Sequence, residues 1–394
     1  MILKYTGLIL NRIKRRGRTA LKWILSCILP VFISVSFAAD NSTLPQKITG
    51  YYLAHENQIG GTAGRLDLEG PSKLDFVWPK PAKQKYKIAL LVPQLADTWK
   101  TFSYAAREAS KRLNLDLTIF SAESYINHGL QIRQLTRKAV SYDGILLSTI
   151  DSYKMADAIN QVAQTTPIVG YANEVFASGV HAKAMVYYFD VSYRLGQWVK
   201  DHIRKNQPSG RVKIAFVMGP ETASWSEDML EGFVASLNND PILRDRLEII
   251  PVLHGHTKSI MQERLVRLVL DNNDNIDYLY GIAPAIERAA SLKNEYKDKH
   301  PNLKLIAAYL NAELYPAVQR GDVLVSASDD MISIGNIAVS NLLRLIRGEE
   351  PNLSTGSFPY VSGPMAQLIT FDNVHNFPFE NLFGPKGYSP KILK

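Results

Sequence analysis

From Tyr86 onward the chain repeats one pattern, a short apolar run that ends in a loop and is followed by residues at helical spacing. In the first repeat, Ile88 to Val92 is continuously apolar, which is typical of a strand buried on both faces of a parallel sheet. Pro93 ends this run, because proline has no amide hydrogen for the ladder. The next apolar residues, from Phe102 to Leu113, keep the period of a helix. Parallel strands need such crossovers, so this pattern restricts the fold strongly.

The same alternation continues to residue 370. Further strands are predicted at 115–120, 144–149, 167–171, 184–188, 212–218, 247–253, 278–280, 305–309, 323–327 and 365–370. Further helices are predicted at 129–142, 153–164, 226–237, 260–270, 284–297, 312–320 and 330–348. Two series of such units predict an α/β protein with two lobes, each a parallel sheet with helices on both faces, and a cleft between the lobes.

The first 38 residues have a different composition. Seven Lys and Arg residues, with no acidic residue among them, precede an apolar run from Trp23 to Phe37. The small residues Ser36 and Ala38 lie at the end of this run. A basic segment, an apolar segment and a small-residue cleavage site predict a secretory signal peptide over 1–38, and hence a periplasmic protein. The alternative is a retained membrane anchor, because the apolar run is close to the length of a membrane span.

Removing the signal peptide changes the charge of the chain. The formal net charge is +8, and subtracting the seven charges of residues 1–38 leaves about +1. No later stretch combines Lys and Arg with interleaved aromatic residues, so the sequence gives no reason to expect nucleic-acid binding. The single cysteine, Cys27, lies in the predicted signal peptide. The mature protein is therefore expected to have neither a disulfide nor a thiolate site.

Two segments lack the strand–helix pattern. Residues 39–85 contain several turn and linker segments and predict an N-terminal arm, which either packs across a lobe or stays partly mobile. Residues 373–394 predict a C-terminal tail.

Three blocks in order carry a family resemblance. They are Asp97-Thr-Trp99 after the first strand, Gly219-Pro220 with Glu231-Gly-Phe233, and the run from Gly321 to Asp329. With these blocks the chain resembles the type I periplasmic binding proteins, and among them the sensors of trimethylamine N-oxide (TMAO) that act with a membrane sensor histidine kinase.

The resemblance covers about residues 86–370 and implies three hinge crossings. They are expected near Phe189-Asp190, Tyr309-Leu310 and 349–353. The implied N-terminal lobe comprises 86–189 and 310–350, and the C-terminal lobe comprises 190–309 and 351–372.

The resemblance also implies a ligand. An N-oxide has a positive nitrogen wrapped in methyl groups, which favours aromatic faces, and an oxide that only accepts hydrogen bonds. Trp99 lies at the position of the family's cleft tryptophan, and Asp97 supplies complementary charge. A purely structural interpretation remains open, in which Trp99 staples the start of a helix and Asp97 lies near its cap.

Four further aromatic residues are candidates for the same site. Tyr125 follows the second strand, Tyr188 lies at the first crossing, and Tyr309 ends the strand at the second crossing. The family is expected to carry tryptophan at the position of Tyr188. Trp225 lies in a loop where the family is expected to carry smaller residues, so it either adds a wall to the site or seals the lobe. Each tyrosine is alternatively a half-buried hinge residue.

The main alternative within this fold is a substrate-binding component of an ABC importer for a sugar or a similar solute. Sugar sites use several polar partners, but the segment from Val217 to Asp240 contains no Arg or Lys. Asp329, Asn173 and Asn311 could still bind hydroxyl groups, although Asp329 is also explained as a helix cap.

An enzyme is not expected. His254 and His256 resemble a metal-binding pair, but no third ligand lies at suitable spacing, and no nucleotide-binding or nucleophile motif follows a strand. We expect no cofactor and no metal. The expected partners are the small ligand and the periplasmic domain of a histidine kinase, with contact to the membrane only through that partner.

The signal-peptide interpretation predicts that the mature chain begins near Ala39 and is recovered from the periplasm. N-terminal sequencing of the exported protein measures this directly. Retention of residues 10–30 in the exported chain would contradict it and favour the anchor.

Overall fold

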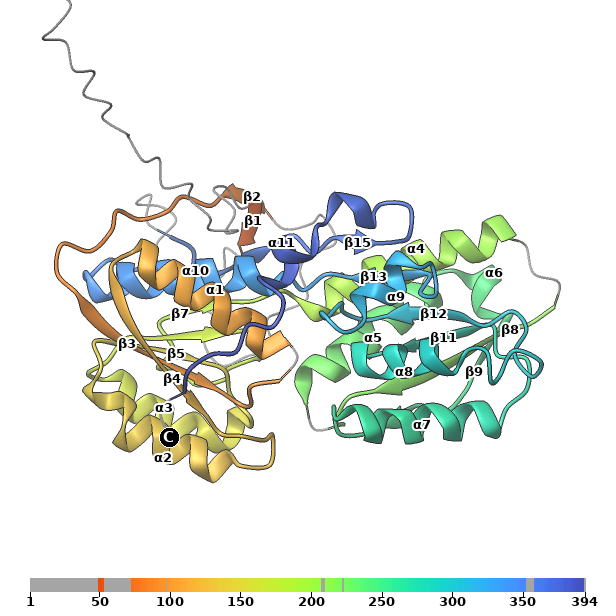
Figure 1. Cartoon of the computed structure of the whole chain (residues 1–394), viewed down its shortest axis with the longest axis horizontal. Coiled ribbons are helices and arrows are strands. Elements are labelled where there is room, and N and C mark those ends of the chain that lie inside the picture. The colour runs from red at the N-terminus through yellow and green to blue at the C-terminus, as the bar shows by residue number, and fades with distance from the viewer. Residues whose placement is uncertain are drawn as a thin grey trace, which may run out of the picture. The chain divides into compact units, whose positions relative to one another are not determined.

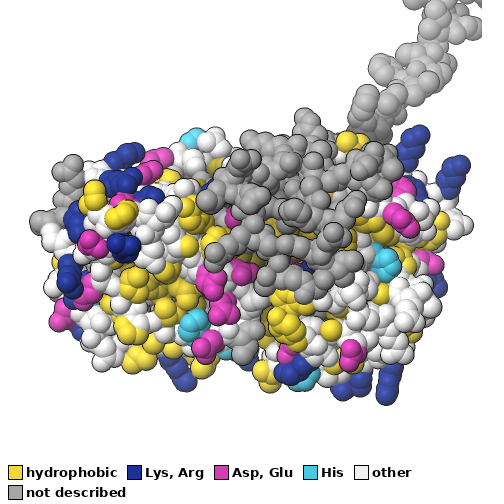
Figure 2. All heavy atoms as spheres, turned by 180° about the vertical axis from the view of Figure 1, so that it is seen from behind, with side chains coloured by type: hydrophobic (Ala, Val, Ile, Leu, Met, Phe, Trp, Pro, Cys, Tyr) yellow, Lys and Arg dark blue, Asp and Glu magenta, His cyan; other side chains and the backbone are white. Residues whose placement is uncertain are grey.

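The computed structural model describes residues 49–52, 72–96, 98–206, 210–221, 223–351 and 358–392. The predicted signal peptide lies outside these residues. Within the described ranges, no helix has both the length and the apolar character needed to span a bilayer. On the face shown in Figure 2, the described Lys and Arg side chains lie mainly towards the periphery, and Asp and Glu side chains gather near the middle.

The first sheet has eight strands in the described part of the chain. In sheet order these are β2 (Ser72–Asp75), β1 (Thr49–Tyr52), β14 (Val361–Pro364), β7 (Ala182–Ala184), β6 (Ile168–Tyr171), β5 (Gly144–Leu147), β3 (Tyr86–Val92) and β4 (Leu115–Ser121). The strands from β14 to β4 pair in parallel. Figure 1 shows α1 (Thr98–Arg112) and α10 (Met331–Ile346) over one face, and α2 (His128–Arg137) and α3 (Ser152–Ala163) over the other.

The burial of β3 explains this layering. Ile88, Leu90 and Val92 belong to one core cluster, which also contains Phe102 of α1. The intervening Ala89 and Leu91 belong to a second cluster on the opposite face. Because side chains alternate along a strand, a continuous apolar run fills both faces at once. The sequence prediction of a doubly buried parallel strand is confirmed.

The second sheet runs in the order β10 (Leu253–His254), β8 (Val212–Met218), β11 (Tyr278–Gly281), β12 (Lys304–Ala307), β13 (Val325–Ala327) and β15 (Leu368–Ile369), with β9 (Leu247–Ile249) also paired to β8. All of its pairs are parallel except β13 with β15. Its helices are α4 (Tyr188–Asn206), α5 (Ser224–Asn238), α6 (Pro241–Arg244), α7 (Ser259–Asp271), α8 (Ala283–Leu292) and α9 (Tyr315–Gln319). Within this layer α4 packs on α5, and α7 packs on α8.

The chain passes between the two sheets at positions that differ from the lobe boundaries implied by the resemblance. Those boundaries place 310–350 in the N-terminal lobe, but its strand β13 pairs with β12 of the second sheet. They place 351–372 in the C-terminal lobe, but its strand β14 pairs with β7 of the first sheet. Both strands are only three or four residues long. So short a segment carries no local signal for the sheet in which it pairs.

The two segments without the strand–helix pattern also contribute to the fold. In the range 39–85, β1 pairs antiparallel with β14, and β2 pairs with β1, so they extend the first sheet. In the range 373–394, η2 (Val374–Asn376) and α11 (Phe379–Phe383) follow β15. Tyr315 of α9 donates a hydrogen bond to the carbonyl of Phe377 (2.8 Å), and Tyr388 meets Tyr104 of α1 edge-on at 5.2 Å. The tail therefore packs against helices of both sheets.

A close helix contact fixes α4 against α5. A Cβ atom on Gly232 of α5 would lie 2.1 Å from the backbone oxygen of Phe189 in α4. A Cβ atom on Gly196 of α4 would lie 2.8 Å from the Cβ of Ser236. The missing side chains let the two backbones approach, so this contact tolerates no added volume.

We expect Gly232→Ala to lower the free energy of unfolding by about 1–3 kcal/mol, because the methyl group must displace a backbone atom. Gly129→Ala in α2 is the matched control, since its nearest neighbour is the mobile end of Arg133 at 3.6 Å. That control should be neutral or stabilising by up to about 1 kcal/mol, because alanine favours a helix over glycine. Urea denaturation measures both values. Equal effects of the two substitutions would contradict the packing argument.

Candidate ligand-binding site

The two tryptophans predicted for the site occupy equivalent places in the two sheets. Trp99 is the second residue of α1, which follows β3, and Trp225 is the second residue of α5, which follows β8. Both strands lie where the strand order reverses, because the chain adds neighbours first on one side and then on the other. In open α/β sheets ligands bind at such switch points, beyond the carboxyl ends of the strands.

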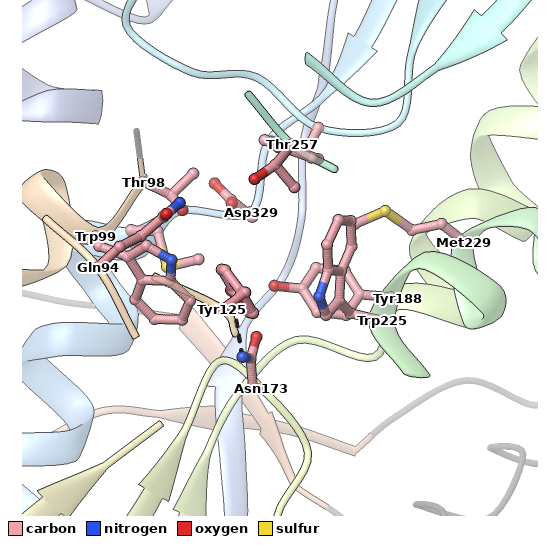
Figure 3. Close-up of a pocket in the computed structure, with 12 residues that line it drawn as sticks. Gln94, Thr98, Trp99, Tyr125, Asn173, Tyr188, Trp225, Met229, Thr257 and Asp329 are labelled. Carbon is pink, nitrogen blue, oxygen red and sulfur yellow. Dashed lines mark hydrogen bonds between the residues drawn. The ribbon is translucent and has the colours of Figure 1, made fainter. Parts of the chain in front are cut away.

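One cavity of about 40 Å³ lies between these two helix starts. Figure 3 shows Trp99 and Gln94 on one side, Trp225, Tyr188 and Met229 on the other, and Tyr125 between them. The lining residues are Gln94, Thr98, Trp99, Tyr125, Asn173, Tyr188, Trp225, Met229, Thr257, Tyr309, Asp329 and Met331. Elements of both sheets thus contribute to one small, aromatic pocket.

Trp99 is held by a stack of aromatic rings. Its indole meets the ring of Tyr171 edge-on at 6.0 Å, and Tyr171 stacks on Phe102 at 3.7 Å. The Tyr171 hydroxyl donates a hydrogen bond to the carbonyl of Leu91 at the end of β3 (3.0 Å). The Trp99 side chain is buried, with only 4% of its surface exposed. It lines the cavity and is also part of the core.

The opposite wall combines Trp225, Tyr309 and Tyr188. The rings of Trp225 and Tyr309 meet edge-on at 6.3 Å. Burial raises the pKa of Tyr188 well above its usual range, and the negative charge of Asp329 raises it further. The Tyr188 hydroxyl therefore stays protonated at neutral pH and can donate a hydrogen bond.

Tyr125 is tied to the strand ends of the first sheet. The side-chain amide of Asn173 donates to the Tyr125 hydroxyl oxygen (3.4 Å) and to the carbonyl of Thr149 (2.8 Å). The Thr149 hydroxyl in turn donates to the carbonyl of Glu174 (2.9 Å). These bonds link the loops after β5 and β6, so they fix one end of the pocket.

The structure brings five of the six predicted site residues to one pocket, namely Trp99, Tyr125, Tyr188, Tyr309 and Trp225. The sixth, Asp97, lies outside the described residues. Whether these residues bind a ligand stays a prediction. The sequence reasoning missed Gln94, Thr98, Met229, Thr257 and Met331. Met229 follows Trp225 by one helical turn, so helical spacing could have identified it.

The residues considered for a sugar have divided roles. Asn173 and Asp329 line the pocket, whereas the Asn311 side chain accepts a hydrogen bond from the amide of Leu314 (2.8 Å). The cap of α10 is Asp330 rather than Asp329, since the Asp330 carboxylate accepts from the amide of Ser333 (3.0 Å). The helix-cap explanation of Asp329 is therefore wrong.

The histidine pair has ordinary partners. His254 contacts the Gly219 carbonyl (3.2 Å), and His256 accepts from the amide of Lys258 (3.1 Å). Across the described ranges, no group of three or more His, Cys, Asp or Glu side chains is arranged to hold a metal ion.

Two acidic residues, Asp228 and Glu174, are sequence neighbours of the pocket residues Met229 and Asn173. Burial raises the pKa of Asp228 in α5 to about 7, and the charges of Glu174, Glu231 and Glu227 add to this shift. Glu174 belongs to the loop after β6 and forms a buried ion pair with Lys183 of β7. The negative charge of Glu174, in a loop of the first sheet, therefore acts on Asp228 in α5 of the second sheet.

Comparison with known proteins supports this architecture. A family model described as periplasmic binding protein domain matches residues 88–350. The chain belongs to this family, whose members are binding proteins. The family and the relatives below indicate a periplasmic location.

The chain is 26% identical over 314 residues to the periplasmic protein TorT of Escherichia coli (strain K12), which covers 79% of this chain and 86% of that protein. A crystal structure of an ABC transporter solute-binding protein from Bradyrhizobium sp. BTAi1, with bound bis-tris, has a TM-score of 0.72 at 22% identity, covering 89% of this chain and 98% of that one. The complex of the TorS sensor domain with TorT, solved without ligand and with TMAO, gives 0.67 at 23% identity, covering 78% and 100%.

The pKa of Asp228 predicts a pH-dependent stability. Its folded pKa of about 7 lies above the ordinary value near 3.9, so the folded state binds more protons between these two values. The free energy of unfolding should therefore fall as pH rises from about 4 to 7. Asp228→Asn should stabilise the protein by roughly 1 kcal/mol or more at pH 8 and hardly at all at pH 4.

Chemical denaturation at both pH values measures this difference. Asp245→Asn serves as the control, because that side chain is 78% exposed. An Asp228→Asn effect of the same size at pH 4 and pH 8 would contradict the assignment.

Proposed function

We propose that this protein is a periplasmic receptor that binds TMAO and passes the signal to the periplasmic domain of a sensor histidine kinase. The observation that carries the proposal is the wall of two tryptophans and three tyrosines around one small pocket. Aromatic faces favour a nitrogen wrapped in methyl groups, because the ring quadrupole attracts its positive charge.

The polar groups of the pocket fit the same molecule. Asp329 is 7% exposed and lines the cavity, so it places a negative field near the ligand nitrogen. The protonated hydroxyl of Tyr188 is a donor for the oxide. No Lys or Arg is among the described residues that line the cavity, which suits a ligand that has no net charge.

The size of the cavity supports a small ligand. A volume of about 40 Å³ is on the order of a few water molecules. TMAO has five heavy atoms, whereas a hexose has more than twice as many. A sugar would therefore require a wider opening of this pocket.

The kinase partner rests on the relatives. TorT is similar to this chain over most of its length, and it has been solved in complex with the TorS sensor domain. A binding protein acts on a partner by presenting different surfaces in different states. A ligand that contacts both lobes binds the closed state more tightly than the open state, so it shifts the protein towards the closed state.

The second candidate is the solute-binding component of an ABC importer. The fold similarity to the Bradyrhizobium solute-binding protein favours it. Co-purification of the mature protein with a kinase periplasmic domain, compared with a permease, distinguishes the two functions. Binding to a permease together with failure to bind any kinase domain would favour the importer.

Substitution of Trp99 tests the ligand. We expect Trp99→Ala to weaken TMAO binding by roughly a hundredfold, because a desolvated cation–π contact contributes about 2 kcal/mol or more and apolar contact is lost with it. Since Trp99 is 4% exposed, the same substitution should also lower the free energy of unfolding by about 3–5 kcal/mol. Trp99→Phe keeps an aromatic face and should retain part of the binding.

Isothermal titration calorimetry of the folded variants measures these affinities. Trp198→Phe is the control, because Trp198 lies in α4, stacks on His202 and does not line the cavity. Normal TMAO binding by folded Trp99→Ala would contradict the proposed site. A wild-type protein that binds a sugar and not TMAO would contradict the proposed ligand.

A further inference from the structure

Trp225 carries a buried donor that the described protein leaves without a partner. The residue is 9% exposed, its indole Nε1 is buried, and it makes no hydrogen bond within the described residues. Buried donors are nearly always paired, because leaving water without a replacement bond costs free energy. Trp225 also lines the cavity, and in Figure 3 the nitrogen-bearing side of its ring faces Tyr125 and Trp99.

The ring is held in this position by its neighbours. A Cβ atom on Gly219 would lie 2.5 Å from Cη2 of Trp225, so the six-membered edge of the indole rests directly on the backbone after β8. Tyr309 meets the ring edge-on at 6.3 Å. Glycine at 219 therefore makes room for the indole, and these contacts hold the ring in one orientation.

We propose that Trp225 is the specificity-determining residue of the pocket, and that its indole N–H donates a hydrogen bond to the oxide oxygen of the bound N-oxide. The proposal rests on the TMAO-binding function and adds the basis of its selectivity. A quaternary ammonium ion of the same shape has a methyl group where the oxide would lie. It leaves the indole N–H unpaired, and a site built to bond a polar atom rejects analogues that lack it.

The two tryptophans then have different roles. Trp99 of α1 offers its face to the methylated nitrogen, and Trp225 of α5 offers its edge to the oxygen. The two helices follow β3 and β8, which belong to different sheets. An N-oxide therefore satisfies both sides of the pocket, whereas a quaternary ammonium ion satisfies only one.

The test compares TMAO with tetramethylammonium, its isostere without an acceptor, in wild-type protein and in Trp225→Phe. The substitution keeps an aromatic ring and removes the N–H. We expect the ratio of TMAO affinity to tetramethylammonium affinity to fall by about tenfold or more, since a hydrogen bond to a charged acceptor is lost with TMAO only. Trp198→Phe is the matched control and should leave the ratio unchanged.

A second measurement does not depend on a variant that folds. In wild-type protein labelled with ¹⁵N-tryptophan, the Trp225 indole N–H resonance should move downfield on adding TMAO and far less on adding tetramethylammonium. If wild type binds TMAO, but the ratio is unchanged in Trp225→Phe and the resonance does not move, the selectivity proposal is wrong and the receptor function stands. If wild type does not bind TMAO, both are overturned.

Discussion

The burial of strands β3 and β8 on both faces is the constraint on which the rest of this structure depends. Strands β3 and β8 have apolar side chains packed on both faces, so neither face can present polar chemistry. Functional groups can then emerge only at the carboxyl ends of the strands. Trp99 and Trp225 emerge there, each one residue inside the helix that follows. The pocket is thus a consequence of how the two sheets are built.

The pocket residues therefore serve both the core and the binding site. Trp99, Tyr188, Trp225 and Tyr309 are all less than a tenth exposed. Side chains held this tightly lose little conformational entropy when a ligand arrives, so they are suited to preorganised recognition. The same tight packing means that truncating them disturbs stability as well as binding.

The fold of this protein is found in proteins of more than one function. The fold is shared with an ABC transporter solute-binding protein and with TorT in its complex with the TorS sensor domain. Fold alone therefore does not assign the function, which has to be argued from the site. Here the proposal of a small methylated N-oxide rests on the aromatic walls, the buried carboxylate and an indole donor that has no partner among the described residues.

The sequence by itself determined the α/β class and most strands and helices, because apolar runs and helical spacing are properties of neighbouring residues. The five aromatic residues that meet at one pocket were expected from the resemblance to a known family. Sequence patterns missed α4, which starts at Tyr188 at the expected first crossing. The lobe boundaries implied by the resemblance assigned the ranges that contain β13 and β14 to the other lobe. Only the tertiary structure decided that Asp330, rather than the pocket residue Asp329, caps α10. It also decided that Gly219 makes room for Trp225, whose indole N–H is unpartnered among the described residues. Such facts are set by packing between distant segments, which no local pattern of residues encodes.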